Sequence, residues 1–225
     1  TSALDVDSDS TSVQLAGGVP SERSATRTAN AEENVAPAKR LIRYPGADVK
    51  LNVAQWPILG SDQAPHIVVE LFDYTCPYCR TMHQHIDVAR QQFGGQIAFI
   101  VMPVPLSREC NPTIENTSPE HVDACEIARL ALGVWRCNPD AFSGYHGWLL
   151  AADRPRTAAE ARQYAETLVD PIALKDALAN PVLTKFLERH VALYKRAGEG
   201  TLPALFTERV TVRGKMDSAE TLCRT

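Results

Sequence analysis

The pattern of hydrophobic and polar residues divides the chain into a polar N-terminal stretch and a longer part with regular periodicity. Residues 1 to about 43 are rich in Ser, Thr, Ala, Asp and Glu and show no sustained helical or strand period. From Val49 on, hydrophobic residues alternate with polar ones, as in a half-buried strand. We therefore expect a flexible tether over residues 1–45, with a partner-binding arm as the alternative, and one folded domain over residues 46–225.

A strand, a helix and a second strand are predicted in the first part of the domain. Residues 67–72 are almost all hydrophobic, which is typical of a central strand covered on both faces. Hydrophobic residues then recur at spacings of three and four from Cys79 to Phe93, which predicts an amphipathic helix with Pro77 in its first turn. Residues 97–104 predict another buried strand, so that the three elements form a right-handed βαβ unit.

The middle of the domain has helical periodicity. Helix starts are predicted at Ser118-Pro119, at Thr157 with Glu160, at Asp170-Pro171 and at Asn180-Pro181. The first of these helices is expected to bury Val122 and Cys125 on one face. Short strand signals return at residues 204–207 and 210–212. The predicted fold class is therefore α/β, with a helical insertion over about residues 106–199.

Composition and charge exclude two classes of partner. The net charge of −4 provides no basic surface that would attract nucleic acid or anionic lipid. No hydrophobic run reaches the ~18 residues that a membrane span requires. The six cysteines suit an oxidising compartment if most are paired. Because the sequence starts at Thr1 without a hydrophobic signal core, we expect a mature form or an excised portion of a longer protein.

The clearest chemical signal is the Cys-Pro-Tyr-Cys motif at residues 76–79. The positive end of a helix dipole and unpaired backbone N–H groups stabilise a thiolate, and Cys76 lies at the predicted helix start. Cys79 lies one turn further on, on the hydrophobic face, where a charged sulfur is disfavoured. We therefore expect Cys76 to be exposed and to act as the attacking cysteine, and Cys79 to be buried and to resolve the intermediate.

A metal site is the alternative for this motif. Zinc sites also use cysteines at this spacing, but zinc ribbons present two such pairs and this chain has one. His83 and His85 are available as further ligands. We favour a redox pair, because two cysteines at a helix start give poor tetrahedral geometry, and we expect both histidines to be ordinary residues of the helix surface.

Residues 60–65 and 70–80, the latter reading Glu-Leu-Phe-Asp-Tyr-Thr-Cys-Pro-Tyr-Cys-Arg, resemble the DsbA-like thioredoxin-fold oxidoreductases of bacterial envelopes. The resemblance implies a thioredoxin fold with the helical insertion between its βαβ half and a ββα half that carries a cis-proline. It implies Cys76 as nucleophile and Cys79 as resolving cysteine. It also implies that Glu70 is a buried carboxylate that exchanges a proton with Cys79. An acid at the edge of the sheet is the alternative for Glu70.

The segment Thr201-Leu202-Pro203 looks like the loop that carries the family's cis-proline and faces the redox pair. Few X-Pro bonds are cis, so this assignment comes from the resemblance. In the family, the loop offers backbone hydrogen bonds to an extended substrate segment. The expected substrate-binding residues are therefore Pro77, Tyr78, Leu202 and Pro203.

The insertion is also similar to the thioredoxin-like domains found near, or fused to, vitamin K epoxide reductase homologues. The residues that carry this similarity are Pro105-Leu106, Cys110-Asn111, His121 and Ala124-Cys125. It implies a structural disulfide between Cys110 and Cys125, for which a metal site with His121 as third ligand is the alternative. Cys137 and Cys223 are then left for a second disulfide, although four cysteines allow three connectivities.

These resemblances imply an extracytoplasmic thiol-disulfide oxidoreductase that forms or exchanges disulfides in unfolded or reduced substrate proteins. No cofactor is expected, and a membrane re-oxidase resembling vitamin K epoxide reductase is the expected partner. The protein is expected in the periplasm or another extracytoplasmic compartment, with the N-terminal segment as a membrane tether. Two alternatives stay open: a reductase or isomerase of the same fold, and a metal-binding carrier that uses Cys76, Cys79 and His83.

Overall fold

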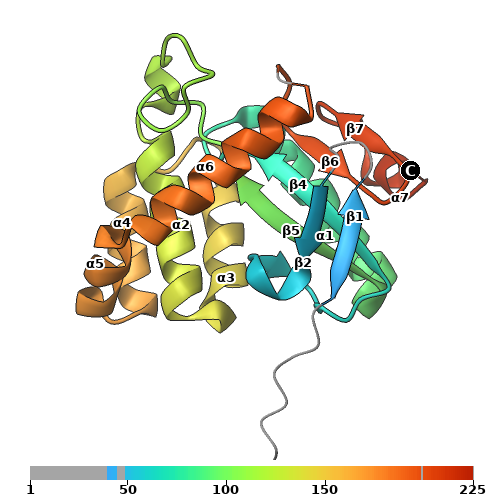
Figure 1. Ribbon diagram of the computed structural model, residues 1–225, viewed down its shortest axis with the longest axis horizontal. Helices are drawn as coiled ribbons and strands as arrows, with labels where there is room; N and C mark the ends of the chain where they lie inside the picture. The colour runs from blue at the N-terminus through green and yellow to red at the C-terminus, as the bar shows by residue number, and fades with distance from the viewer. Residues whose placement is uncertain (1–39, 45–48, 199, 225) are drawn as a thin grey trace, which may run out of the picture. The chain divides into compact units, whose positions relative to one another are not determined.

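The computed structural model describes residues 40–44, 49–198 and 200–224, all within the unit Pro37–Thr225. This part of the chain folds into a five-stranded sheet, a separate two-stranded hairpin and surrounding helices (Figure 1). The elements are, in chain order, β1 (Leu41–Tyr44), β2 (Val49–Asn52), η2 (Val53–Gln55), β3 (Ile58–Leu59), β4 (His66–Phe72), α1 (Pro77–Phe93), η3 (Gly94–Gln96), β5 (Ile97–Pro103), η4 (Pro119–His121), α2 (Ala124–Cys137), α3 (Pro139–Leu150), α4 (Ala158–Leu168), α5 (Pro171–Ala179), α6 (Pro181–Arg196), β6 (Ala204–Phe206), β7 (Thr211–Arg213) and α7 (Ala219–Arg224).

Strand β4 is the centre of the five-stranded sheet, whose order is β3-β5-β4-β6-β7. It pairs in parallel with β5 and antiparallel with β6. Every residue of β4 from Ile67 to Phe72 is buried, which explains why this segment lacks the polar alternation of a half-exposed strand. The predicted βαβ unit is therefore confirmed, with α1 as the connection between the two parallel strands.

Helix α1 begins and ends where the sequence predicted. Cys76 is its N-cap residue and Pro77 occupies the first turn, where the missing backbone N–H of proline costs no hydrogen bond. Met82 and Ile86 are fully buried on the side that faces the core. The helix stops at Gly94, whose φ of 54° lies in the left-handed region that glycine adopts without strain.

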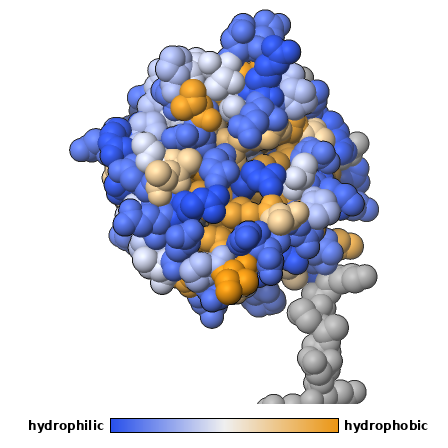
Figure 2. Space-filling view, turned by 90° about the vertical axis from the view of Figure 1, so that its left-hand side faces the viewer, coloured by the Kyte–Doolittle hydropathy of each residue, from blue (hydrophilic) through white to orange (hydrophobic). Residues whose placement is uncertain are grey.

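Helices α2 to α6 form the insertion between β5 and β6, which confirms the predicted α/β fold with a helical insertion. Helix α2 is its centre, because it packs against α3, α4, α5 and α6. In Figure 1, α6 passes in front of the sheet and α1 lies behind it, so that both faces are covered. The face of the molecule on the insertion side is mostly hydrophilic, with small separate hydrophobic groups (Figure 2), because these amphipathic helices turn their apolar sides inward.

The boundary predicted between tether and domain is wrong for residues 41–44. This segment forms β1, which pairs with β2 in a hairpin. Ile42 and Tyr44 are buried, and the Tyr44 hydroxyl donates a hydrogen bond of 3.1 Å to the Ile67 carbonyl oxygen of β4. The folded part therefore includes residues before position 46, while residues 1–39 of the predicted tether lie outside the described residues.

The helix predicted to start at Ser118-Pro119 is also different in the structure. Residues 119–121 form the short 3-10 helix η4, and α2 begins at Ala124. Val122 is 60% exposed and does not belong to the buried face. The reason is a change of helix type, since a 3-10 turn of three residues places side chains on other faces than the 3.6-residue period assumes.

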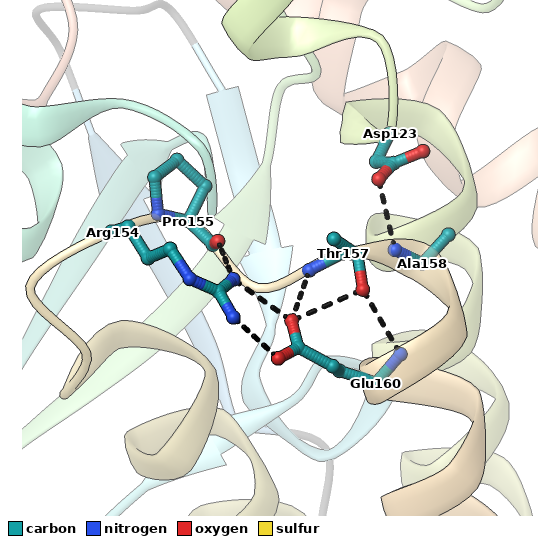
Figure 3. A network of polar contacts seen from close by, with 6 residues as sticks. All are labelled: Asp123, Arg154, Pro155, Thr157, Ala158 and Glu160. Atoms are coloured by element: carbon teal, nitrogen blue, oxygen red, sulfur yellow. Dashed lines mark hydrogen bonds and ion pairs between the residues drawn. The ribbon is translucent and has the colours of Figure 1, made fainter.

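The start of α4 has the capping box that the sequence predicted (Figure 3). The Thr157 hydroxyl oxygen accepts the Glu160 N–H at 3.2 Å, and the Glu160 carboxylate accepts the Thr157 N–H at 2.8 Å. Arg154 donates to both oxygens of the same carboxylate. Asp123, which precedes α2, accepts the Ala158 N–H at 3.0 Å and so connects the starts of the two helices.

Replacing Thr157 by Ala removes one side of this capping box and leaves a backbone N–H of α4 without its acceptor. We expect the free energy of unfolding to fall by about 1 kcal/mol, the usual effect of losing such a cap. Chemical denaturation of Thr157→Ala and of the control Thr157→Ser, which keeps the hydroxyl, measures the difference. Equal stability of the two variants would contradict the role given to this hydroxyl.

Candidate active site

Cys76 lies at the point where the loop after β4 turns into α1. Its sulfur accepts a hydrogen bond of 3.4 Å from the Cys79 backbone N–H, in the first turn of the helix. Its own backbone N–H donates to the Asp73 carbonyl oxygen at 3.2 Å, which fixes the turn from the strand. The sulfur is therefore placed against the unpaired N–H groups and the positive dipole end of α1.

Cys79 lies directly behind Cys76, inside the protein. It is fully buried, and its sulfur accepts a hydrogen bond of 3.4 Å from the Asp73 backbone N–H. Both cysteines have free thiols in the structure, which therefore represents the reduced form of the pair.

The two thiols differ in acidity because their surroundings differ. Hydrogen bonds lower the pKa of Cys76, first from the Cys79 thiol and then from backbone N–H groups of the first turn, against the opposing effect of burial. Burial raises the pKa of Cys79 well above its usual range. One sulfur is thus prepared to be a thiolate, and the other to stay protonated.

Cys76 is much less exposed than the sequence predicted. Only 4% of Cys76 is accessible, whereas the neighbouring Tyr78 is 56% exposed. Sequence reasoning placed Cys76 at the surface because it considered the helix end alone, and the rest of the fold covers most of this end. A partner that reacts with Cys76 must therefore reach it through a small exposed surface.

Glu70 lies in the central strand β4, between β5 and β6, and is fully buried. The alternative of an acid at the sheet edge is therefore excluded. Among the described residues, neither of its carboxyl oxygens has a hydrogen-bond partner. Burial, with smaller contributions from the charges of Asp87 and Cys76, raises the pKa of Glu70 to about 8. At neutral pH this side chain is mostly a neutral acid that lies close to the redox pair.

The peptide bond between Leu202 and Pro203 is cis, and both residues are buried. The strand that follows, β6, pairs with β4 so that Ala204 lies opposite Leu71. Continuing this register places Pro203 beside Phe72, at the end of β4 from which the loop to Cys76 leaves. The fold therefore brings together the two sequence segments, 70–80 and 201–203, on which the resemblance rests.

Sequence reasoning gave no role to Asp73 and Thr75, which belong to the same loop, and considered their partner His121 in η4 only as an alternative metal ligand. The Asp73 carboxylate accepts hydrogen bonds from the backbone N–H groups of Thr75, at 2.7 Å, and Leu106, at 3.0 Å, and from the Thr75 hydroxyl. The Thr75 hydroxyl also lies 2.6 Å from Nδ1 of His121. The acidic residue inside an otherwise hydrophobic motif was the available signal, but the contact with His121 spans 46 positions.

His83 is not the surface residue that we expected. It is 4% exposed, its ring packs edge-on against His146 of α3 at 4.9 Å, and its Nε2 lies 3.4 Å from the Asp87 carboxylate. Burial lowers the pKa of His83. The missed partner His146 is completely buried and its Nδ1 lies 3.0 Å from the Tyr74 hydroxyl. His85, one of the two candidate ligands, is half-buried.

The residues that the structure describes contain no group of three or more His, Cys, Asp and Glu side chains arranged to hold a metal ion. Neither metal alternative from the sequence, Cys76 and Cys79 with His83 or Cys110 and Cys125 with His121, has such an arrangement. In the second set the two sulfurs are bonded to each other.

Cys110 and Cys125 form the disulfide that the resemblance implied, with a Cα–Cα distance of 6.0 Å. It closes the loop between β5 and α2 that carries His121. The pairing of Cys137 with Cys223 is wrong, since both thiols are free. Cys137 ends α2 in the insertion, whereas Cys223 in α7 donates to the Gln92 side chain of α1 at 3.6 Å.

Comparisons with known proteins agree with this architecture. A periplasmic thioredoxin-like protein from Salmonella enterica serovar Typhimurium is similar with a TM-score of 0.59 and 21% identity, over 75% of this chain and 87% of that chain. The thiol-disulfide exchange protein alpha-DsbA2 from Wolbachia pipientis gives 0.61 and 17%, over 76% and 84%. Oxidised BdbD from Bacillus subtilis gives 0.57 and 21%, over 77% and 95%.

At such low identity, this likeness establishes the fold. A comparison with curated proteins found no match. The family model described as Thioredoxin, however, matches residues 53–222, which include β4, α1, the insertion and the cis-proline strand. The chain therefore belongs to the thioredoxin family.

Proposed function

We propose that this protein is a thiol-disulfide oxidoreductase that forms disulfides in reduced substrate proteins. The observation that carries the proposal is the contrast within the motif: the helix start lowers the pKa of Cys76, while burial raises that of Cys79. A disulfide between two such sulfurs is reduced readily, because the reduced form gains a stabilised thiolate at Cys76. The pair therefore favours the oxidase direction over the reductase and isomerase alternatives.

The reaction starts from the Cys76–Cys79 disulfide. A substrate thiolate attacks the Cys76 sulfur, the S–S bond breaks, and its electron pair passes to the Cys79 sulfur. A second substrate thiolate then attacks the substrate sulfur of the mixed disulfide and releases Cys76 as a thiolate. The substrate has lost two electrons and two thiol protons, and the redox pair has gained both electrons.

Glu70 is the proposed acid for the first step. Cys79 leaves as a sulfur whose thiolate is disfavoured by burial, so the step needs a proton on that sulfur. With a pKa of about 8, Glu70 still holds a proton at neutral pH and lies in the same buried region. It gives that proton to Cys79 and becomes a carboxylate, which takes the proton back when the pair is oxidised again.

Substrate binding is assigned to the residues around Cys76. Pro77 and the exposed ring of Tyr78 adjoin the sulfur in the chain, and the cis-Pro203 loop ends beside β4. Leu202 offers backbone groups to an extended substrate segment next to the reacting sulfur, and Pro203 has no backbone N–H that would compete with the substrate there. The small exposed surface of Cys76 favours an unfolded or extended substrate chain over a folded surface.

An extracytoplasmic location and a membrane re-oxidase complete the proposal. The Cys110–Cys125 disulfide supports an oxidising compartment, where such bonds persist, and one similar structure is a periplasmic protein. No described helix has the length and apolar character needed to cross a bilayer. Reduced Cys76 and Cys79 must be oxidised after each turnover, and a re-oxidase resembling vitamin K epoxide reductase is the proposed acceptor.

The first test replaces Cys79 by Ala and supplies a reduced, unfolded substrate protein together with a mild oxidant. We expect a mixed disulfide through Cys76 to accumulate, because the sulfur that normally resolves it is absent. Non-reducing electrophoresis and mass spectrometry measure it. The matched variant Cys76→Ala is expected to form far less adduct, since Cys79 is buried. No adduct with Cys79→Ala, or equal amounts with both variants, would contradict the mechanism.

The second test replaces Glu70 by Gln, which cannot donate a proton as an acid. We expect the rate of mixed-disulfide formation per substrate thiolate to fall by about 10²-fold at neutral pH, a usual loss for one general acid. In the wild type this rate decreases as pH rises through about 8, where Glu70 loses its proton. In Glu70→Gln the decrease is absent. Stopped-flow kinetics with a single-thiol peptide measure the rate and its pH dependence. The control variant is Glu166→Gln, which makes the same substitution on the exposed face of α4. An unchanged rate and pH profile would exclude Glu70 as the acid.

The Glu70→Gln variant is also expected to differ from wild type in how its stability depends on pH. The folded-state pKa of Glu70 is raised from 4.5 to about 8, so the folded form binds its proton more tightly than the unfolded form. The stability that this tighter proton binding contributes is fully present below pH 4.5 and is lost as pH rises through about 8. Relative to wild type, Glu70→Gln is therefore expected to gain stability across this range, on the order of a few kcal/mol at the upper end. Denaturation at a series of pH values measures it, and a constant difference would show that Glu70 is not held protonated by the fold.

A further inference from the structure

A line of polar groups runs from the redox loop to the helical insertion. The Asp73 carboxylate is 1% exposed and accepts hydrogen bonds from Thr75 and from the Leu106 backbone N–H. The Thr75 hydroxyl contacts this carboxylate and, at 2.6 Å, Nδ1 of His121. The His121 side chain is 13% exposed, so the line reaches the solvent at its far end. We call these three residues the Asp73–Thr75–His121 network.

The chemistry of the hydroxyl group fixes the direction of these hydrogen bonds. A threonine hydroxyl carries one proton, and an ionised carboxylate only accepts. When Asp73 is ionised, Thr75 therefore donates to Asp73 and accepts a hydrogen bond from a protonated Nδ1 of His121. If Nε2 also binds a proton, His121 becomes a cation that lies one hydroxyl away from the buried carboxylate.

Asp73 is in direct contact with the redox pair. Its backbone N–H donates to the Cys79 sulfur at 3.4 Å, and its carbonyl oxygen accepts the Cys76 N–H at 3.2 Å. The hydrogen bond from the Cys79 thiol is the main cause that lowers the pKa of Cys76, and the negative charge of Asp73 opposes this effect. The charge on this one carboxylate therefore acts directly on the acidity of the reacting sulfur.

Other charged or titratable groups around the network come from the loop itself and from α1, β4 and η4. In the loop, Tyr74 lies between Asp73 and Thr75, and its pKa is raised by burial and, to a smaller extent, by the charges of neighbouring groups that include Asp73. Helix α1 contributes Cys76, Cys79 and Arg80, whose guanidinium donates to the Thr75 carbonyl oxygen at 3.0 Å. Strand β4 contributes Glu70, and η4 contributes Glu120, whose carboxylate lies 4.0 Å from Nε2 of His121. The Cys110–Cys125 disulfide closes the loop that carries His121 and keeps it near Thr75.

We propose that His121, acting through Thr75, keeps the Asp73 carboxylate ionised beside the redox pair and so limits how far the Cys76 thiolate is stabilised. His121 and Thr75 are positioning residues in this proposal, because neither takes part in the exchange of sulfur bonds. The network adjusts how strongly oxidising the pair is, and this inference rests on the proposed oxidoreductase function. Through His121, the helical insertion therefore influences the redox properties of the Cys76–Cys79 pair.

The sign of the effect follows from the groups that act on Asp73. Burial raises the pKa of Asp73, and the Thr75 hydrogen bonds, the Leu106 N–H and the charge of His121 oppose this rise. Removing the Thr75 hydroxyl or the imidazole lets Asp73 bind a proton at higher pH. The charge that opposes the Cys76 thiolate is then lost, and the thiolate forms at lower pH. Both variants therefore make Cys76 more acidic and the pair more oxidising.

The test uses the full chain with Thr75→Val, which has the shape of threonine without the hydroxyl, and His121→Gln, which removes the imidazole ring. Ultraviolet absorbance of the thiolate is followed against pH in the reduced protein. In each variant we expect the Cys76 titration to move down by about half a unit to one unit, which is up to a tenfold larger thiolate fraction below its pKa. The equilibrium with glutathione is expected to shift several-fold toward the reduced enzyme.

Controls separate this role from simple packing. Thr75→Ser keeps the hydroxyl and is expected to titrate like wild type. Because both substitutions break one network, the double variant Thr75→Val/His121→Gln is expected to shift no further than either alone. Thermal melting of each variant verifies that it is folded.

The possible failures are distinct. If wild-type Cys76 titrates like an ordinary thiol, the proposed function itself fails. If wild-type Cys76 is acidic, three results exclude the role of His121 while the proposed function stands. These are a Cys76 titration that is unchanged in the variants, one that moves to higher pH, and single-variant shifts that add up in the double variant.

Discussion

The chemistry of this protein depends on one local constraint: the chain must leave a buried central strand and begin a helix with a sulfur at its N-cap. Cys76 then lies against the first-turn N–H groups of α1, which have no partner within the helix. Pro77 is compatible with this start because it needs no hydrogen bond there. The Asp73 carbonyl oxygen holds the turn in place. A sulfur in any other position of the strand or helix would lack this stabilisation.

Burial then makes the two sulfurs different. Cys79 and Glu70 lie in the core, where neither a thiolate nor a carboxylate is well solvated, and burial raises the pKa of both groups. Perturbed pKa values of this kind cluster at functional sites, which is consistent with the proton transfer proposed for Glu70. The helical insertion adds His121 to this region from the side, far away in the sequence and close in space.

Local patterns in the sequence predicted the local structure well, but they could not predict contacts between residues that are far apart in the sequence. The continuous hydrophobic run of β4 and the three-and-four spacing of α1 are properties of neighbouring residues, and they located Cys76 at a helix start. The strand Leu41–Tyr44 was missed because it is four residues long and follows a polar stretch. The burial of His83 depends on His146 of α3, which no pattern within α1 reveals. The Thr75–His121 contact depends on the loop geometry of the insertion for the same reason.

The same limit explains why the pairing of the cysteines was predicted only in part. The number and spacing of six cysteines do not fix their pairing, and the resemblance gave only Cys110 with Cys125 correctly. Cys137 and Cys223 belong to elements that pack against different parts of the fold.

The central claim is that Cys76 is acidic and keeps a small exposed surface, while Cys79 is completely buried. Competitive alkylation of the reduced protein tests it most directly. The protein is treated briefly with iodoacetamide at about pH 6, where ordinary thiols are almost entirely protonated, and each cysteine is quantified by mass spectrometry. The account predicts that Cys76 is labelled well before the other three free cysteines, Cys79, Cys137 and Cys223, and that Cys79 stays unlabelled. Labelling of Cys76 no faster than Cys137 or Cys223, or labelling of Cys79 alongside it, would contradict the account.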